Sequence, residues 1–337
     1  MLKLVFMGSD AIALPALHWL AGEGRSIAQV VAVFTQPDRA AGRGQKVQAN
    51  AIKEWALARS LPVRQPEKVG FAEQEDVAAW QPDLVLVMAY GHILRADFIN
   101  TPRLGTLNLH TSILPAYRGA SPIQTALAAG EKEIGVTLMR IVPQLDAGPV
   151  ADVERVPVDP LDTAGEAEAK LARACVPLLA RCLPKIAAGT QIFTEQNAAE
   201  ATFCRRHEKA DGVLDFSAPA AMLAGRINGL MPWPGCSVAI SGQPVKLGLA
   251  DVLPESVCNV LYYKPAVAGE VLGADADGLH VATGQGVLRL RKLQRPGGKM
   301  LPAAEFLRGF PVSPGSALPS APMPPLVART PFPRAKG

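Results

Sequence analysis

The sequence lacks any uninterrupted apolar run that approaches the roughly 18 residues of a membrane-spanning helix. Its opening residues, MLKLVFMGSD, predict a short β-strand and lack the pattern of a secretory signal peptide. These two absences argue against a membrane-spanning or secreted protein. We therefore expect a protein that works in the cytoplasm.

Cysteine pairs and a nucleotide-binding glycine turn are also missing. The five cysteines are odd in number and scattered, with no CxxC pair and no histidine at a metal-ligand spacing. We interpret them as small buried hydrophobic residues. The first predicted strand is followed by MGSDAIALP, which contains neither GxGxxG nor an acidic residue placed for a ribose. A nucleotide-dependent dehydrogenase is therefore disfavoured.

A chain of 337 residues is long enough for two domains, each with a hydrophobic core of its own. Its net charge of +4 is too mild to indicate a nucleic-acid partner. The distribution of the basic residues along the chain carries more information than their total.

The first half of the chain alternates apolar runs with helical periodicity. KLVFM, QVVAVF, DLVLVMAY and GTLNLH predict strands, and IALPALHWLAGEG, ANAIKEWALARS and FAEQEDVAAW predict helices between them. Near-continuous apolar strands separated by helices are typical of a mostly parallel, Rossmann-like sheet that is covered on both faces. GVTLMRI and PVADVERVPV predict two more strands, and a long helix ending at Gly189 completes an α/β domain over residues 1–189.

The second half of the chain has a different pattern. Residues 190–203 are polar and unpatterned, which predicts a linker. Short predicted strands with glycine-rich connections fill residues 204–318 and are typical of a small β-barrel. Residues 319–337 are proline-rich, and we expect them to form a disordered tail.

Asn108 and His110 lie two residues apart at the end of the predicted strand GTLNLH, so both side chains leave the same face. Ligands of parallel sheets bind at such carboxyl ends. An asparagine amide donates more strongly to a carbonyl oxygen that gains charge in a tetrahedral intermediate, and histidine transfers protons near neutral pH. The alternative is that both side chains only satisfy backbone groups at the strand end.

Asp146, in the turn QLDAGP between two predicted strands, is the candidate third member of this site. A carboxylate within reach of His110 would fix the orientation of the imidazole and favour its charged form. Aspartate is also a common turn former. The spacing alone leaves both interpretations open.

The stretch NLHTSILPAYRGASPIQ with the later DAG resembles the signature of the formyltetrahydrofolate-dependent formyltransferases. The resemblance extends from Lys3 to about Leu318. It implies the α/β formyltransferase fold followed by a small OB-like β-barrel domain. It also implies that Asn108 and His110 polarise a formyl group, while Asp146 orients the pair and assists proton transfer. Three positions depart from the family pattern: Ile113, Gln144 and Arg206.

The same resemblance implies a site for 10-formyltetrahydrofolate, the formyl donor, at two strand ends. In the family, the Ser-x-Leu-Pro loop lines the folate site, and the backbone of a second strand end, here AYGHIL, holds the pterin. The implied folate-binding residues are Ala89, Tyr90, Gly91, His92, Ile93, Leu94, Ser112, Ile113, Leu114 and Pro115.

Residues 34–50, FTQPDRAAGRGQKVQAN, form a basic connection far longer than most in such sheets. It resembles the loop that tRNA-formylating members of the family insert into the acceptor end of initiator tRNA. Arg43 can fork onto a phosphate or a base edge. The alternative is a solvated basic loop. The implied tRNA-binding residues are Arg39, Gly42, Arg43, Gly44 and Lys46.

NGLMPWPGCSVAISGQPVKL and GGKMLPAAEFLRG resemble the C-terminal domain of the same family, a small barrel that grips the tRNA backbone. Basic residues recur along this half, as phosphate contacts require, and a hydrated polar surface is the alternative. The candidate tRNA contacts there are Arg206, Lys246 and Lys299. Trp233, between two prolines, is expected to be a core residue or a packing wedge, and a base-stacking platform is the alternative.

The resemblance therefore implies an enzyme that transfers the formyl group of 10-formyltetrahydrofolate to the α-amino group of methionyl initiator tRNA, as a monomer and without a metal. One alternative is a formyltransferase that acts on an amino sugar nucleotide or a purine precursor. Such an enzyme would need neither the long basic loop nor the basic second domain. Another alternative is a non-catalytic tRNA-binding module, which would have no reason to align Asn108, His110 and Asp146.

Overall fold

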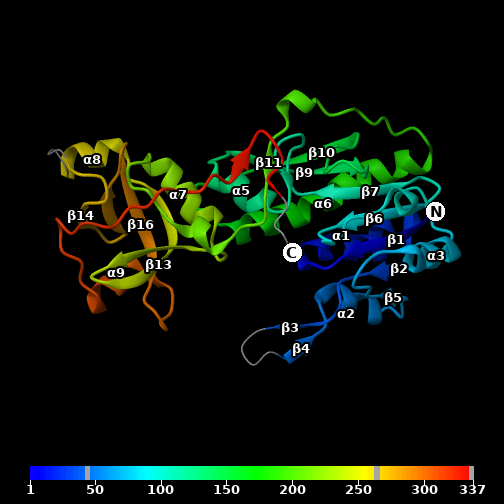
Figure 1. The fold of residues 1–337 in the computed structure, drawn as a ribbon, viewed down its shortest axis with the longest axis horizontal. Helices are drawn as coiled ribbons and strands as arrows, with labels where there is room; N and C mark the ends of the chain where they lie inside the picture. Colours follow the sequence, from blue (N-terminus) through cyan, green and yellow to red (C-terminus); the bar gives the residue numbers. More distant parts are fainter. Residues whose placement is uncertain (42–45, 262–265, 334–337) are drawn as a thin grey trace. The chain divides into compact units, whose positions relative to one another are not determined.

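The computed structural model describes residues 1–41, 46–261 and 266–333 (Figure 1). The chain forms two compact units. Unit 1 contains residues 1–118, 134–156 and 168–201, and unit 2 contains residues 119–133, 157–167 and 202–337. This grouping differs from a single boundary at residue 189, because two short segments of the first half belong to the second unit.

Unit 1 is built on a seven-stranded sheet in the order β10-β9-β7-β6-β1-β2-β5. Five strands run parallel: β1 (Leu2–Gly8), β2 (Ala28–Phe34), β5 (Val63–Arg64), β6 (Leu84–Met88) and β7 (Thr106–His110). β9 (Glu133–Arg140) runs antiparallel to β7, and β10 (Val150–Pro157) forms the edge. The predicted mostly parallel α/β sheet is confirmed.

The helices of this part of the chain explain why the central strands are apolar throughout. They are α1 (Leu14–Ala21), α2 (Ala51–Leu57), α3 (Phe71–Trp80), α4 (Ala96–Ile99) and α6 (Ala164–Ala187), whose first turn belongs to unit 2. Phe34 of β2, Val77 of α3 and Phe98 of α4 share one buried cluster with β1 and β6. The thiol of Cys175 in α6 contacts Met88 at the end of β6. A sheet with such neighbours excludes water from its strands.

The long connection after β2 contains a short antiparallel hairpin that the sequence did not predict. Its strands are β3 (Arg39–Ala41) and β4 (Lys46–Gln48), which lie near α2 (Figure 1). Val47 is 70% exposed, so the hairpin has no apolar pattern to reveal it. The candidate tRNA-binding residues Gly42, Arg43 and Gly44 lie outside the described residues.

Unit 2 is organised around an antiparallel sheet in the order β12-β13-β16-β15-β14, with β17 paired to β16. The strands are β12 (Cys236–Ile240), β13 (Gln243–Val252), β14 (Val271–Ala274), β15 (Leu279–Ala282), β16 (Val287–Gln294) and β17 (Leu301–Pro302). The helices are α5 (Pro122–Ala128), α7 (Ala220–Gly229), α8 (Glu255–Leu261) and α9 (Ala303–Gly309). The predicted second, β-rich part of the fold is confirmed.

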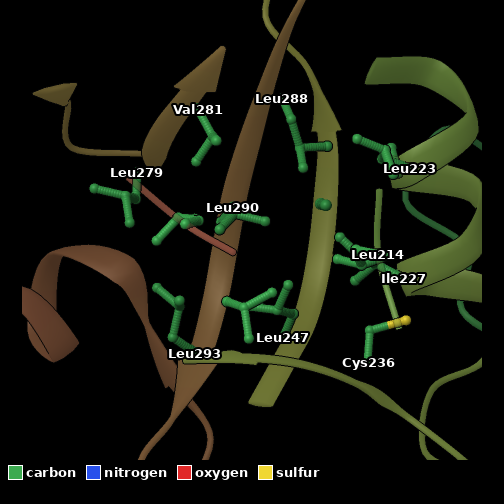
Figure 2. Close-up of a cluster of buried hydrophobic side chains, with 14 of the residues drawn as sticks. Leu214, Leu223, Ile227, Cys236, Leu247, Leu279, Val281, Leu288, Leu290 and Leu293 are labelled. Atoms are coloured by element: carbon green, nitrogen blue, oxygen red, sulfur yellow. The ribbon is translucent and has the colours of Figure 1, made fainter. Parts of the chain in front are cut away.

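The core of unit 2 lies between α7 and this sheet. Figure 2 shows Leu223 and Ile227 of α7 on one side, with Leu247, Leu288 and Leu290 of β13 and β16 among the side chains they meet. Alternate residues of β12 supply this core, which gives that strand a half-buried pattern, whereas β15 is buried along its whole length.

The proline-rich tail differs from the disordered segment that its composition predicts. β18 (Val327–Ala328) pairs with β11 (Phe203–Cys204), and a two-residue strand β8 (Arg118–Gly119) lies on the other side of β11. Leu326 is 7% exposed and belongs to the core of unit 2. Proline carbonyls still accept hydrogen bonds, and Pro324 accepts one from Arg226 at 3.1 Å.

Two further expectations are settled by burial. Trp233 is 62% exposed, so of the two expected places, core or packing wedge, the core is wrong. Four of the five cysteines are buried and Cys258 is partly buried, as expected of small hydrophobic residues. Across the described ranges, no helix has the length and apolar character that a membrane crossing requires.

Candidate active site

Asn108 and His110 lie at the carboxyl end of β7, between β6 and β9 in the sheet of unit 1. As alternate residues of one strand they share a face. His110 is 6% exposed and Asn108 is half-buried. Within the described part of the chain the Asn108 amide has no hydrogen-bond partner, so its two N–H donors are available to a ligand.

The His110 ring lies between a backbone carbonyl and a carboxylate. Its Nε2 is 3.0 Å from the carbonyl oxygen of Tyr117, and its Nδ1 is 3.8 Å from Oδ2 of Asp146. A carbonyl oxygen only accepts hydrogen bonds, so Nε2 carries the proton of the neutral ring and Nδ1 is the basic atom. The Nδ1 side of the ring therefore faces the carboxylate of Asp146.

Asp146 occupies a strained turn between β9 and β10. Its φ is +46°, in the left-handed region that costs a side chain free energy. A Cβ at Gly148 would overlap the carbonyl oxygen of Arg140, so only glycine fits there. Burial lowers the pKa of the neighbouring Arg118 guanidinium, and the negative charge of Asp146 acts against that shift. The turn thus places a carboxylate beside both His110 and a buried cation.

The loop after β7 is fixed by hydrogen bonds of its own. The Ser112 hydroxyl donates to the carbonyl oxygen of Ala116 at 2.7 Å. The Thr137 hydroxyl, on β9, donates to the carbonyl oxygen of Ser112 at 2.6 Å and accepts from the N–H of Leu114 at 3.1 Å. Thr137 is fully buried and pairs with His110 across the two strands. The loop that carries Ser112, Ile113, Leu114 and Pro115 is therefore attached to the strand beside the site.

Residues 89–94 follow β6 at the same edge of the sheet. Ala89 and Gly91 have φ values of +48° and +81°, and the carbonyl oxygen of Tyr90 accepts a hydrogen bond from Gln36 at 2.9 Å. The Tyr90 ring points into the core, where burial raises the pKa of its hydroxyl. Ile93 is 75% exposed. The segment thus turns the Tyr90 side chain inward and leaves backbone at the surface near the site.

Comparison with known proteins identifies the family of the chain. The family model described as Formyl transferase matches residues 2–183, and the model described as Formyl transferase, C-terminal domain, matches residues 206–311. The chain belongs to the formyl transferase family. The family that the sequence motifs indicated is confirmed.

Relatives of this formyl transferase match over almost the whole chain. A protein of Acidovorax ebreus named methionyl-tRNA formyltransferase is 38% identical over 331 residues, which cover 95% of this chain and all of the relative. A protein of the same name from Moorella thermoacetica is 39% identical, covering 94% of this chain and 99% of the relative.

Solved structures share the fold of this formyl transferase at low identity. HypX from Aquifex aeolicus, in complex with tetrahydrofolic acid, has a TM-score of 0.58 at 17% identity and covers 91% of this chain and 47% of that chain. An N-formyltransferase from Helicobacter canadensis, in complex with folinic acid and dTDP-3-aminofucose, has a TM-score of 0.63 at 16% identity. The match covers 86% of this chain and 99% of that chain. At these identities the likeness concerns the fold alone.

The candidate tRNA-binding residues of unit 1 are only partly described. Arg39, at the start of β3, is exposed, and its guanidinium donates to the Gln36 amide oxygen at 3.4 Å. Lys46 begins β4. The hairpin of this formyl transferase therefore presents Arg39 to solvent.

The basic residues of unit 2 fall into two groups. Arg205 pairs with Asp211 and Arg289 with Asp251, so both guanidinium groups are committed to carboxylates. The three candidates for tRNA contact are exposed, and among the described residues none of them has an ion-pair partner: Arg206, Lys246 and Lys299. Val245 and Leu247 on either side of Lys246 are buried, so the strand directs Lys246 outward.

The sequence did not reveal the residues that support the catalytic candidates. Thr137 is found only from the register of β7 and β9, which places it opposite His110. Gln196, in the segment expected to be a linker, donates to the carbonyl oxygens of Asp146 and Gly148, each at 2.8 Å. That segment has no periodicity, so no sequence signal distinguishes Gln196 from its polar neighbours.

Proposed function

We propose that this formyl transferase transfers the formyl group of 10-formyltetrahydrofolate to the α-amino group of methionine on initiator tRNA. The observation that carries the proposal is identity of 38% to 39%, over regions that include both units, to relatives named methionyl-tRNA formyltransferase. The N-formyltransferase in complex with an amino sugar nucleotide matches at only 16%. An amino sugar nucleotide is therefore the less favoured substrate.

The residues after β6 fit the formyl donor. In the described structure the backbone groups of residues 91–94, in the irregular segment between β6 and α4, make no hydrogen bond to another residue. The His92 Nε2 atom is buried and likewise lacks a partner among the described residues. Such free donors and acceptors suit the hydrogen-bonding edge of a pterin. This agreement supports a folate site formed by residues 89–94 and the loop 112–115.

His110 is suited to move the proton that the reaction transfers. An α-amino group has a reference pKa of about 8, so it must lose a proton before it attacks a carbonyl carbon at neutral pH. That first proton is released to solvent. Nδ1 of His110, the basic atom of the ring, can accept the second proton, which the amine nitrogen loses after it bonds to the formyl carbon, while Asp146 lies beside the ring. The same Nδ1 can then protonate the folate nitrogen as its bond to the formyl carbon breaks.

Asn108 is suited to stabilise charge on the formyl oxygen. As the amine nitrogen bonds to the formyl carbon, this oxygen becomes negative, and a free amide N–H at the strand end can donate to it. The donor supplies the formyl group, and one N–C bond forms while another breaks. No metal takes part in these steps.

The exposed basic residues are suited to hold a tRNA. Lysine and arginine side chains neutralise phosphates and release counterions when they bind. Arg206, Lys246 and Lys299 keep their charges free of carboxylates within the part of the chain that the structure describes. Arg39, Lys46 and the intervening Gly42, Arg43 and Gly44 complete the proposed tRNA-binding set. We also infer that the enzyme works in the cytoplasm. We infer that it acts as a monomer, because one chain supplies every proposed group.

Formylation of tRNA tests the proposal directly. Labelled 10-formyltetrahydrofolate is incubated with initiator and elongator methionyl-tRNA, using wild-type protein and the Asn108→Ala variant as the inactive control. The expected result is label on initiator tRNA, less on elongator tRNA and almost none with the variant. Absence of label on methionyl-tRNA with well-folded protein would refute the proposal.

A further inference from the structure

The side chain of Gln196 connects the two segments that hold His110 and Asp146. Its Nε2 donates to the carbonyl oxygens of Asp146 and Gly148, both at 2.8 Å. Its Oε1 accepts from Nε and Nη2 of Arg118, at 3.1 and 2.7 Å. An amide has two N–H donors and two lone pairs on oxygen, so these four bonds use its full capacity. A guanidinium only donates and a carbonyl only accepts, so the Gln196 amide must turn its oxygen toward Arg118 and its nitrogen toward the turn.

The Asp146 turn depends on this outside support. Asp146 has a left-handed backbone, and the turn's own bond, from the N–H of Ala147 to the carbonyl oxygen of Gln144, is long at 3.4 Å. Two carbonyl oxygens of the turn are bound instead by Gln196. Its segment is anchored nearby, because Thr194 and Val150 exchange two backbone hydrogen bonds of 2.8 Å. Gln196 is therefore attached to β10 on one side and holds the turn on the other.

Arg118 carries the connection to the histidine. It directly follows Tyr117, whose carbonyl oxygen accepts the hydrogen bond from Nε2 of His110. Arg118 is 7% exposed, so its position is set by the surrounding chain. A path of hydrogen bonds and one peptide link thus runs from His110 through Arg118 and Gln196 to Asp146. This path connects His110 and Asp146, whose Nδ1 and Oδ2 atoms are 3.8 Å apart.

We propose that Gln196 is a positioning residue that sets the spacing between His110 and Asp146 and thereby the rate of proton transfer. This inference rests on the roles proposed above for those two residues. Gln196 touches neither substrate in the proposal and acts only through the turn and Arg118.

Three variants test this role. Gln196→Leu removes all four hydrogen bonds at similar volume, and Gln196→Glu keeps an acceptor for Arg118 but cannot donate to the turn. Gln191→Leu is the matched control. Gln191 lies in the same segment and also donates to two backbone carbonyls, those of Ala151 and Ile192, at 2.9 and 2.8 Å. Its contacts do not include the Asp146 turn.

The expected result is a change in kcat without a matching change in KM. Both Gln196 variants should lose on the order of 10- to 100-fold in kcat, as a misplacement near 1 Å can cause. KM for the formyl donor should stay within about twofold, and Gln191→Leu should behave as wild type. Combined with Asp146→Asn, Gln196→Leu should cost no more than about a further twofold, because it acts through the same group.

Two results would overturn the role. One is a kcat within about twofold of wild type for Gln196→Leu while Asp146→Asn is impaired. The other is the same fold-loss from Gln196→Leu in the wild-type and Asp146→Asn backgrounds, which indicates a general structural effect. Failure of the proposed role of Asp146 has a different signature, a wild-type kcat in Asp146→Asn itself, and it would remove the basis of the positioning role too.

Discussion

Individual side chains at the carboxyl end of β7 differ in how much of their hydrogen-bonding capacity is free. The hydroxyl groups of Ser112 and Thr137 donate hydrogen bonds to backbone carbonyl oxygens of the loop after β7. The Nε2 proton of His110 is donated to the carbonyl oxygen of Tyr117. The Asn108 amide has no hydrogen-bond partner among the described residues, and Nδ1 of His110 faces Asp146 at 3.8 Å. The chemistry proposed here follows from that division.

Asn108→Ala should lower kcat by about 100-fold or more, because one donor to the developing oxyanion is lost. KM should change little, since that charge exists only as the reaction proceeds. The melting temperature should not fall, because the amide has no partner within the described residues. Steady-state kinetics and a melting curve check this. A well-folded variant with near wild-type kcat would contradict the oxyanion role.

Thr137→Val should destabilise the protein and raise KM for the formyl donor. The substitution leaves the Leu114 N–H and the Ser112 carbonyl without their partner, at a cost of about 1–3 kcal/mol per buried group. Thr106→Val is the control, since that buried hydroxyl donates to Ile99 at the opposite end of β7. The control should lose stability alone, and equal KM values in both variants would count against the loop's folate role.

Among individual residues, the sequence indicated the side chains that we propose to act in the reaction, but not the side chains that hold them in place. Asn108, His110 and Asp146 stand out because their residue types and spacing fit a known chemistry. Thr137 and Gln196 matter through a strand register and a bridge between backbone carbonyls. Neither feature leaves a pattern in a single sequence.

Among the short elements, the 3-10 turn Lys209–Gly212 is built on a buried ion pair. Asp211 is fully buried, and Arg205 donates to it at 2.6 and 2.8 Å. Burial alone would raise the pKa of Asp211, but hydrogen bonds from Arg205 and the Glu208 N–H outweigh it and lower that pKa. A lowered folded pKa gives stability that is present above the unfolded value, about 3.9, and lost as the pH falls further.

Asp211→Asn should therefore destabilise unit 2 at pH 7, by about 3 kcal/mol, because the charge of Arg205 loses its partner. The difference from wild type should narrow as the pH falls below about 4. Denaturant unfolding at a series of pH values measures both effects. Glu305→Gln, at an exposed carboxylate of α9, is the control, and a pH-independent difference would contradict the ion-pair account.

The tail gives a second prediction for an element. Leu326→Ala should destabilise unit 2 by about 2 kcal/mol, because a leucine in the core is truncated. Arg329→Ala, at an exposed position three residues later, should have no effect. Equal melting temperatures for wild type and Leu326→Ala would support the disordered tail that the composition predicts.

Elements were predictable where burial imposes a pattern. Strands β1, β2, β6 and β7 are apolar because both faces of their sheet are covered. The hairpin of β3 and β4 and the packed tail carry no such pattern. The tail is held by one buried leucine, by the pairing of β18 with β11 and by hydrogen bonds such as that from the Phe216 N–H to the Ser320 hydroxyl, none of which requires a periodic sequence.

For the whole molecule, two units could be predicted from length and from the change of pattern. The segments that make up each unit could not be predicted. Residues 119–133 and 157–167 belong to unit 2 although they lie in the first half of the chain. Glycines 225 and 229 of α7 come close to backbone atoms of α5, a contact that only the folded chain displays.

The basic surface of unit 2 predicts how tRNA binding depends on salt. If Lys246 and Lys299 each neutralise one phosphate, the Lys246→Ala, Lys299→Ala double variant should have a log–log salt slope shallower by about two units. Its kcat at saturating tRNA should be unchanged. The control is the double variant Arg25→Ala, Lys185→Ala, which removes two exposed charges from unit 1. Equal slopes for the two double variants would contradict these phosphate contacts.

Competition between acceptors tests the central claim most directly. Wild-type protein is given labelled 10-formyltetrahydrofolate together with initiator methionyl-tRNA and an amino sugar nucleotide, and the label on each acceptor gives the ratio of kcat/KM values. The account predicts label on the tRNA in large excess. Preferential label on the amino sugar nucleotide would contradict it, even with Asn108, His110 and Asp146 acting as described.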